Sequence, residues 1–142
     1  MESAILGLIL DSSVIIQAER KRQTVEELLT EVRRVFGEVD VAISAVTVAE
    51  LVHGIARGGT PEIRDRRRAF IDELKCHVPV HPVTAETGEI AGTISGEQAA
   101  KGIKLPIDDL LIGASALEQG YGVATGNPRH FQLIPGLVVV RL

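Results

Sequence analysis

Short apolar runs alternate with longer amphipathic segments along this chain, and this alternation constrains the fold more than any other feature. The first run, Ile5–Leu10, contains no polar side chain and ends at Asp11. An unbroken apolar run of this length is typical of a strand buried on both faces of a sheet. Short runs at Val39–Ser44, Tyr121–Asn127 and Leu137–Val140 predict further strands.

Helical periodicity occupies the segments between these runs. The clearest helix opens with Thr24 and Glu27, which form a capping-box pair, and stops at Gly37. The prolines in His77–Val83 favour an edge strand or a connection for that segment. Further helices are expected directly after Asp11, from Thr47 to the glycines at 58 and 59, from Thr60 through Leu74, over Thr84–Lys101 and over Pro106–Gln119.

Strands that alternate with helices imply right-handed βαβ crossovers, which build a largely parallel sheet covered by helices on both faces. We therefore expect an α/β fold, a three-layer α/β/α sandwich with a central, mainly parallel sheet. Residues 1–142 contain no linker or repeat and are expected to form a single domain. Aromatic residues make up only 3% of the chain, which suits buried strands better than an aromatic surface that stacks nucleic-acid bases.

Charge and cysteine content narrow the possible partners and the compartment. The net charge of −4 means that any nucleic-acid binding needs local basic patches, or metal ions that offset phosphate repulsion. Cys76 is the only cysteine, which excludes an intrachain disulfide and a thiolate metal cluster. The N-terminal segment lacks the basic region of a signal peptide, and no apolar run reaches the length of a membrane span. We expect a soluble cytoplasmic protein that makes no contact with a membrane.

Acidic residues follow the first two predicted strands, at the sheet edge where parallel α/β folds bind ligands. Asp11 ends a buried strand, where an unpaired carboxylate is costly. A helix N-cap is the alternative role for Asp11, although Ser12 and Ser13 would cap equally well. Glu50 lies near the same edge, but its spacing from Thr47 also fits a capping box.

The stretch PIDDLLIGASA places two adjacent acids at the start of a nearly apolar helix. Asp109 shares a helical stripe with the small residues Gly113, Ala116 and Gly120, which leaves room for an ion or for a close backbone. Asp108 lies on a different stripe of the helix, which carries larger side chains. The alternative is that both acids complement the helix dipole and that the small stripe serves helix packing.

A hard-cation site is the chemistry that these residues favour together. Asn127 follows another strand, although Asn-Pro is also a common turn opener, and Thr125 also suits an ordinary strand position. Carboxylate and amide oxygens select Mg²⁺ or Mn²⁺, and a cluster of like charges is destabilising without a cation. Such a site supports phosphodiester hydrolysis, because the metal activates water and orients the scissile phosphate.

Four motifs resemble a known family. LILDSSVII, SAVTVAELVHG, PIDDLLIGASAL and VATGNPRHFQLIPGLVV occur in the order and spacing of the PIN-domain ribonucleases, and they run from residue 8 to residue 139. Within that family the chain most resembles the VapC toxins of type II (VapBC) toxin–antitoxin pairs. The resemblance implies a PIN-like domain, RNA as substrate, a homodimer and a cognate VapB-like antitoxin that covers the acidic site.

The resemblance also implies roles for individual positions. Asp11, Glu50 and Asp109 match the family's catalytic acids, which hold Mg²⁺ or Mn²⁺. Asn127 takes the fourth catalytic place, which is Asp or Asn in the family, and Thr125 is the hydroxyl residue that accompanies it.

Two neighbouring positions depart from the family pattern or vary within it. Asp108 falls at a variable position, and we expect it to serve mainly as a cap. Arg129, His130 and Phe131 stand where an acid often precedes the Phe, so a fifth acid is missing and the number of metals stays undetermined. His130 lies close to Asn127 and is a candidate for substrate contact.

Basic residues are concentrated near two of the predicted helices. They either contact the phosphate backbone or form a solvated face paired with neighbouring acids, and we favour the solvated face. His53, His77 and His81 have no ligand-like spacing and are expected to be structural or surface residues. The basic residues are Arg57, Arg64, Arg66, Arg67 and Arg68, with Arg20, Lys21 and Arg22 near the first helix; the expected acidic partners are Glu62, Asp65, Asp72 and Glu73.

Three other classes of protein are alternatives to an active nuclease. A haloacid-dehalogenase-type phosphatase needs a second acid two residues after Asp11, where this chain has Ser13. A receiver domain needs adjacent acids after the first strand and a late lysine, where Ser12 and Asn127 stand. A catalytically inactive PIN-like RNA-binding or scaffold module is the remaining alternative. Since three acids and a permitted Asn are present, we expect an active ribonuclease.

Overall fold

Residues 5–142 are described by the computed structural model, and five parallel strands form its central sheet. The strand order is β3-β2-β1-β4-β5, and every neighbouring pair is parallel. The expectation of a largely parallel sheet is confirmed, and so is an edge position for the segment with prolines, whose strand Val80–His81 lies between Pro79 and Pro82. The strands are β1 (Gly7–Leu10), β2 (Asp40–Ser44), β3 (Val80–His81), β4 (Gly122–Thr125) and β5 (Val139–Arg141).

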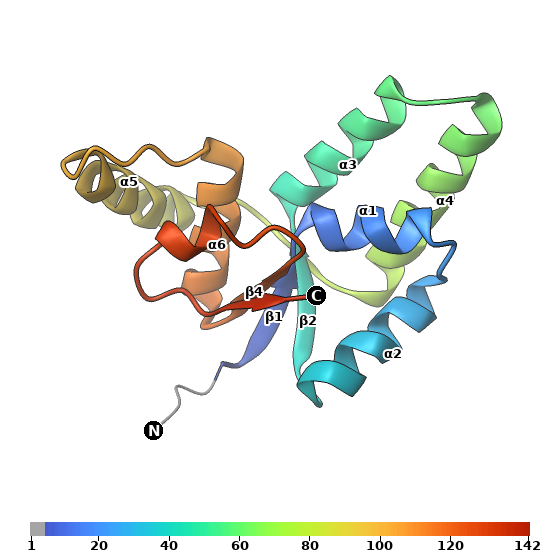
Figure 1. Ribbon diagram of the computed structural model, residues 1–142, viewed down its shortest axis with the longest axis horizontal. Helices are drawn as coiled ribbons and strands as arrows, with labels where there is room; N and C mark the ends of the chain where they lie inside the picture. The colour runs from blue at the N-terminus through green and yellow to red at the C-terminus, as the bar shows by residue number, and fades with distance from the viewer. Residues whose placement is uncertain (1–4) are drawn as a thin grey trace.

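Helices cover both faces of this sheet, as expected for three layers (Figure 1). The first four helices pack on one face and the last two on the other, because the two apolar cores that they line lie on opposite sides of the strands. A short 3₁₀ helix at Phe131–Leu133 lies between β4 and β5. The six helices are α1 (Ser12–Arg20), α2 (Val25–Phe36), α3 (Ala45–Arg57), α4 (Pro61–His77), α5 (Ala85–Ala99) and α6 (Ile107–Gln119).

The central strand β1 contributes to both cores. Its side chains alternate between the faces, so Leu8 and Leu10 join the core beneath α1 to α4 while Ile9 joins the core beneath α5 and α6. All three side chains are fully buried. Burial on both faces explains why the sequence of this strand shows no polar alternation, and it leaves Asp11 as the first polar side chain at the strand's carboxyl end.

Helix caps follow the sequence in most places, with one error. Thr24 and Glu27 form the expected capping box of α2, and Thr60 accepts a hydrogen bond from the Ile63 amide at the start of α4. The predicted start of α3 at Thr47 is wrong. Ser44 is the N-cap, because β2 runs into α3 without a connecting loop, and Thr47 lies inside the helix with its side chain fully buried.

Strand boundaries are shorter than the apolar runs predict. Tyr121, Gly126 and Asn127 lie outside β4, because apolar composition does not distinguish a paired strand from the chain that leads into and out of it. No helix of residues 5–142 is both long enough and apolar enough to cross a lipid bilayer. The first four residues of the N-terminal segment, for which the sequence argues against a signal peptide, lie outside the described residues.

Gly7 tests the packing of β1 against its neighbours. A Cβ atom at this position would lie 2.6 Å from the Asp40 carbonyl oxygen and 2.8 Å from the Tyr121 ring. Gly7→Ala should therefore lower the free energy of unfolding by about 1–3 kcal/mol, the usual effect of overpacking. Thermal and urea denaturation measure this change.

Gly88 in α5 provides the matched control, since a Cβ atom added there would meet no other atom within 4 Å. Gly88→Ala should raise stability by roughly 0.5–1 kcal/mol, because alanine is the better helix former. If both substitutions shifted stability in the same direction, the close contact at Gly7 would not govern the packing of β1.

Candidate active site

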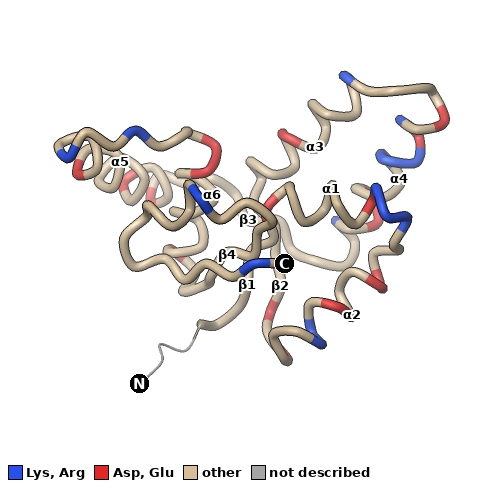
Figure 2. Tube along the Cα trace, in the orientation of Figure 1, with Lys and Arg blue, Asp and Glu red and all other residues tan. Residues whose placement is uncertain are grey.

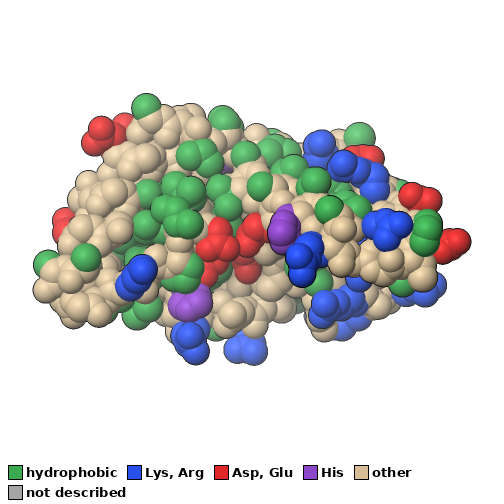
Figure 3. Space-filling view, turned by 90° about the horizontal axis from the view of Figure 1, so that it is seen from above, with side chains coloured by type: hydrophobic (Ala, Val, Ile, Leu, Met, Phe, Trp, Pro, Cys, Tyr) green, Lys and Arg blue, Asp and Glu red, His purple; other side chains and the backbone are tan. Residues whose placement is uncertain are grey.

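Four acidic residues meet at the carboxyl edge of the sheet. Asp11 follows β1, Glu50 lies on α3 directly after β2, and Asp108 and Asp109 occupy the first turn of α6. Glu50 and Asp109 each experience repulsion from Asp108 and Asp11, so the four carboxyl groups share one electrostatic environment. Figure 3 shows acidic side chains gathered in a patch in the middle of this face, next to an area of hydrophobic side chains.

Asp11 is held by hydroxyl groups from two elements. Its Oδ2 atom accepts hydrogen bonds from Ser13 Oγ at 2.8 Å and from Thr125 Oγ1 at 2.9 Å. Asp11 occupies the N-cap position of α1, but its side chain makes no capping hydrogen bond. The residue is 6% exposed, so the two hydroxyls and the strand end fix the orientation of its carboxylate inside the protein.

Glu50 belongs to this cluster and not to a capping box. Burial, together with the neighbouring Asp108 and Asp11 carboxyls, raises its pKa to about 8, while the Ser12 hydroxyl opposes the shift. The Glu50 Oε1 atom is buried and has no hydrogen-bond partner among the described residues. The Thr47–Glu50 capping interpretation is therefore wrong, because the helix begins at Ala45 and Glu50 faces other acids.

The adjacent acids of α6 have different contacts. Pro106 occupies the N-cap position and no side chain caps the helix, so the capping role expected for Asp108 is not observed; its carboxyl group lies against Glu50. Asp109 Oδ2 lies 2.8 Å from His130 Nδ1. Burial raises the pKa of Asp109, and the His130 bond partly offsets that rise.

Thr125 connects Asp11 to Asn127 through hydrogen bonds. Thr125 is fully buried, and its hydroxyl donates to Asp11 and accepts from the Asn127 backbone amide at 3.0 Å. The Asn127 side chain is exposed and forms no hydrogen bond with an acid in residues 5–142. The structure thus brings Asp11, Glu50 and Asp109 together with Thr125, while Asn127 lines a neighbouring cavity.

Ser13 and His130 contact the acids in ways that the sequence did not predict. The sequence indicates only a capping role for Ser13, although a hydroxyl two residues after a strand-ending Asp is placed to bond that Asp. His130 is a candidate for substrate contact by sequence; the structure adds a contact between its ring and Asp109, which the sequence did not predict. Since 21 positions separate His130 from Asp109, no local sequence signal identifies that pair.

The arginines of α4 pair mainly with an acid that the sequence did not single out. Glu19 of α1 is buried, and its carboxylate lies 3.0 Å from Arg66 Nε and 3.8 Å from Arg67 Nε. Arg68 pairs with Asp72 at 3.8 Å, and both of these side chains are largely exposed. Only this last pair matches the expected set of partners, because the fold brings α1 against α4.

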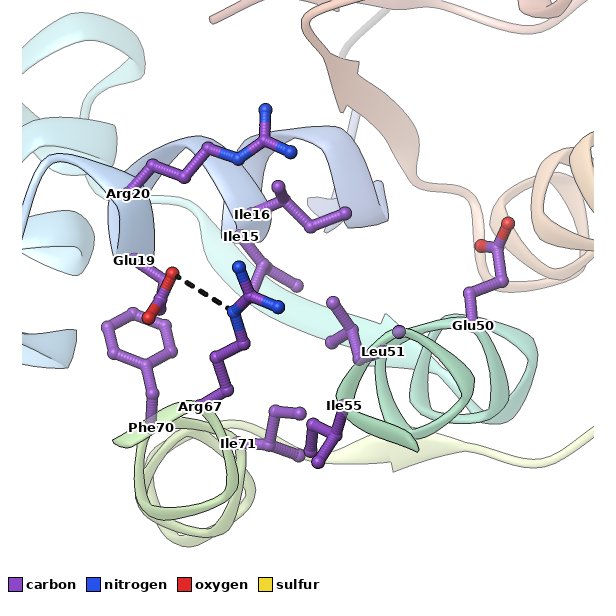
Figure 4. Close-up of a pocket in the computed structure, with 11 residues that line it drawn as sticks. Ile15, Ile16, Glu19, Arg20, Glu50, Leu51, Ile55, Arg67, Phe70 and Ile71 are labelled. Carbon is purple, nitrogen blue, oxygen red and sulfur yellow. Dashed lines mark ion pairs between the residues drawn. The ribbon is translucent and has the colours of Figure 1, made fainter. Parts of the chain in front are cut away.

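An apolar groove of about 200 Å³ leads away from Glu50 (Figure 4). It lies between α1, α3 and α4, and the Glu19–Arg67 ion pair stands at its other end. We call it the α1–α4 groove. Its apolar lining consists of Ile15, Ile16, Leu51, Ile55, Phe70 and Ile71.

The acidic cluster has the donor chemistry of a divalent-cation site. As the side chains lie, no group of three or more His, Cys, Asp or Glu residues in the described chain surrounds one ion position. The buried, unpartnered Oε1 of Glu50 and the mutual repulsion of the carboxyls nevertheless leave oxygen donors that a cation would satisfy. The residues present therefore fit a hard divalent cation.

Comparison with known proteins places this chain in a family. The family model described as PIN domain matches residues 8–137, so the chain belongs to the PIN-domain family. The chain is 30% identical over 134 residues to Ribonuclease VapC5 of Mycobacterium tuberculosis, covering 94% of this chain and 92% of that protein. It is 29% identical to Ribonuclease VapC1 of Rickettsia felis, with 95% and 96% covered.

Solved structures show the same fold. VapBC from Salmonella typhimurium, solved bound to DNA, superposes with a TM-score of 0.79 at 25% identity, covering 96% of this chain and 98% of that chain. VapBC2 from Rickettsia felis, solved with a promoter DNA fragment, gives a TM-score of 0.81 at 20% identity, with 95% and 98% covered.

Glu50 should make the stability of the protein depend on pH. In the folded protein it keeps its proton up to about pH 8, whereas the ordinary pKa is 4.5. The folded state therefore binds more protons between these values, and its stability falls as pH rises through that window. In metal-free buffer at pH 8.5, the melting temperature of Glu50→Gln should be about 3 °C above that of the wild type. This shift corresponds to ~1 kcal/mol in the free energy of unfolding, after a discount for solvent screening.

At pH 4.5 the two proteins should melt together, since Glu50 is then protonated in the folded wild type. Glu97→Gln, which changes an exposed residue of α5, is the control and should leave the pH dependence intact. Identical melting temperatures for wild type and Glu50→Gln at pH 8.5 would show that ionisation of Glu50 does not destabilise the folded protein.

Proposed function

We propose that the protein is a metal-dependent endoribonuclease that acts as the toxin of a toxin–antitoxin pair in the cytoplasm. The observation that supports this most directly is the gathering of Asp11, Glu50 and Asp109 at the carboxyl edge of a PIN-domain sheet. The relatives named above are ribonucleases, and the Salmonella typhimurium relative is described as a tRNA(fMet)-specific endonuclease, 30% identical over 97 residues, 68% of this chain and 71% of that protein.

The three acids would hold Mg²⁺, or Mn²⁺ in its place. The bound cation supplies an activated water, orientation of the phosphate and charge for the leaving oxygen. Ser13 and Thr125 fix the Asp11 carboxylate through hydrogen bonds, so that ligand does not need to reorganise. Glu50 would hold the cation as a carboxylate, so it would have to give up its proton to serve as a ligand.

Asp109 is oriented by His130, through the 2.8 Å contact between His130 Nδ1 and Asp109 Oδ2. Asp108 adds negative charge against Glu50 and strengthens the need for a cation. Asn127 is placed to contact the substrate and not the acids, because its exposed side chain lines the cavity beside Ser13. The site thus consists of three acids that would bind the cation, the residues that position these acids, and the Asn127 amide beside them.

Inhibition by a VapB-like antitoxin is the second part of the proposal. The α1–α4 groove starts at Glu50, is apolar along most of its length and ends at the Glu19–Arg67 ion pair. An antitoxin segment with apolar side chains would fill it and bring a basic side chain to the acids. The related structures are described as VapBC complexes, which supports a partner of this kind. A homodimer is proposed from the family resemblance.

Substitution of the acids tests the nuclease. Asp11→Asn and Asp109→Asn should each reduce Mg²⁺-dependent cleavage of total RNA by roughly 100-fold or more, since each removes a charged ligand. Asp108→Asn should retain cleavage to within about tenfold. Asp65→Asn, on the exposed face of α4, is the control and should cleave like the wild type.

Equal cleavage by wild type and Asp11→Asn would remove the assignment of the site. Cleavage by neither protein in Mg²⁺ or Mn²⁺ would favour the alternative of an inactive RNA-binding or scaffold module. A loss confined to Asp108→Asn would place the catalytic acid one residue earlier on α6.

Ile16 tests the role of the groove. Its side chain lines the groove and is 39% exposed. Ile16→Asp should weaken inhibition by the cognate antitoxin at least tenfold, because burying such a side chain contributes about 1.5–3 kcal/mol. RNA cleavage by the variant alone should be unchanged. Val35→Asp alters a similarly exposed apolar residue of α2 outside the groove and should be inhibited normally.

A further inference from the structure

A second cavity lies on the other side of α1 from the α1–α4 groove. Its volume is about 380 Å³, within the range of about 300–1,000 Å³ that is typical of small-ligand sites. It opens between α1, the start of α2 and the chain that follows β4 and β5. We call it the Lys21–Arg141 cavity. It is lined by Ser13, Val14, Gln17, Ala18, Lys21, Gln23, Leu28, Glu31, Gly126, Asn127, Arg141 and Leu142.

This cavity adjoins the acidic cluster through a single side chain. Ser13 lines the cavity, and its hydroxyl donates to Asp11 Oδ2 at 2.8 Å and accepts from the Gly126 amide at 3.0 Å. A ligand in the cavity therefore lies one hydroxyl group away from a proposed metal ligand. A polymer that places one phosphodiester at the acids has its neighbouring unit in reach of this cavity.

The charge of the cavity suits an anion. Lys21 and Arg141 both line it, and neither forms an ion pair within residues 5–142. The one acidic side chain in its wall, Glu31, already accepts a hydrogen bond from the Gln23 amide at 3.0 Å. Figure 2 shows basic residues at the end of α1 and next to the C-terminus.

Three arginines of α4, unlike Lys21 and Arg141, form ion pairs. Arg66 and Arg67 pair with Glu19, and Arg68 pairs with Asp72. Lys21 and Arg141, by contrast, face one cavity beside the acidic cluster and form no ion pair within residues 5–142. Gln17 and Asn127 add exposed amide groups that donate hydrogen bonds to phosphate or ribose oxygens.

We propose that the Lys21–Arg141 cavity is the subsite for the nucleotide next to the scissile phosphate, and that Lys21 and Arg141 bind the phosphate of that nucleotide. This inference rests on the proposed ribonuclease function. Lys21 and Arg141 bind a phosphate and not a base edge, so the recognition that they supply does not depend on base identity. The two cations offset the repulsion between the acidic cluster and the RNA on either side of the cleaved bond.

The test replaces both cations by neutral side chains of similar length, in Lys21→Gln/Arg141→Gln. The matched control is Lys101→Gln/Lys104→Gln, which makes the same change of charge at two exposed lysines in the loop after α5. A single-stranded RNA of mixed sequence, about 12 nucleotides long, is cleaved in Mg²⁺ at several salt concentrations, and the salt slope reports the phosphate contacts. Melting curves followed by circular dichroism establish that all the proteins are folded.

The KM of the cavity variant should rise at least tenfold while kcat changes by less than about twofold. The slope of log affinity against log salt should fall by about 0.7, because one neutralised phosphate on a single strand accounts for roughly 0.7. Bis(p-nitrophenyl) phosphate, which carries no neighbouring nucleotide, should be hydrolysed equally by variant and wild type. The single variant Lys21→Gln should show about half of the change in slope.

If the wild type cleaves RNA and the double variant has the same KM and the same salt slope, the subsite proposal is overturned. The ribonuclease proposal is then unaffected. If the wild type does not cleave, the ribonuclease proposal fails, and the subsite is decided by binding. The same RNA, labelled with fluorescein, is then titrated with wild type and variant. Binding at least tenfold weaker in the variant supports the subsite, whereas equal dissociation constants or no binding by the wild type overturn it.

Discussion

The carboxylate of Asp11 is the point at which the sheet and the site depend on each other. Its backbone amide donates to the Ala124 carbonyl of β4, and its side chain accepts from Ser13 of α1 and Thr125 of β4. Three elements are therefore joined around a single buried anion. Because each of these bonds restrains the same residue, the direction in which Asp11 faces is set by the fold and not by its own rotamer preference.

The other acids are less favourably placed, and the difference is informative. Glu50 and Asp109 are partly buried, repel their neighbours and have raised pKa values, and the Glu50 Oε1 atom lacks a partner among the described residues. A protein selected for stability alone would replace such groups with neutral ones. Local rules are broken mostly where function requires it, and the energetic cost concentrated at this sheet edge agrees with a binding site for a cation.

Much of the fold was predictable because short-range rules govern it. The buried strand at Gly7–Leu10 and the Thr24–Glu27 capping box follow from composition and spacing over a few residues. The start of α3 was missed because β2 passes into the helix with Ser44 as its cap, so strand and cap share a residue. The Glu50–Asp108 and Asp109–His130 contacts were not predictable in this way, since packing of distant segments creates them.

Helix α1 separates the two cavities. Ile15, Ile16 and Glu19 line the α1–α4 groove, whereas Gln17 and Lys21 line the cavity on the other side. Residues of these two sets alternate along the same short helix, yet their side chains do not share a surface. Changes that alter the fit of a protein partner can therefore accumulate on one side without altering contacts on the other. With the inhibitor in the groove and the RNA in the cavity, as proposed above, inhibitor specificity can change during evolution without changing the contacts to RNA.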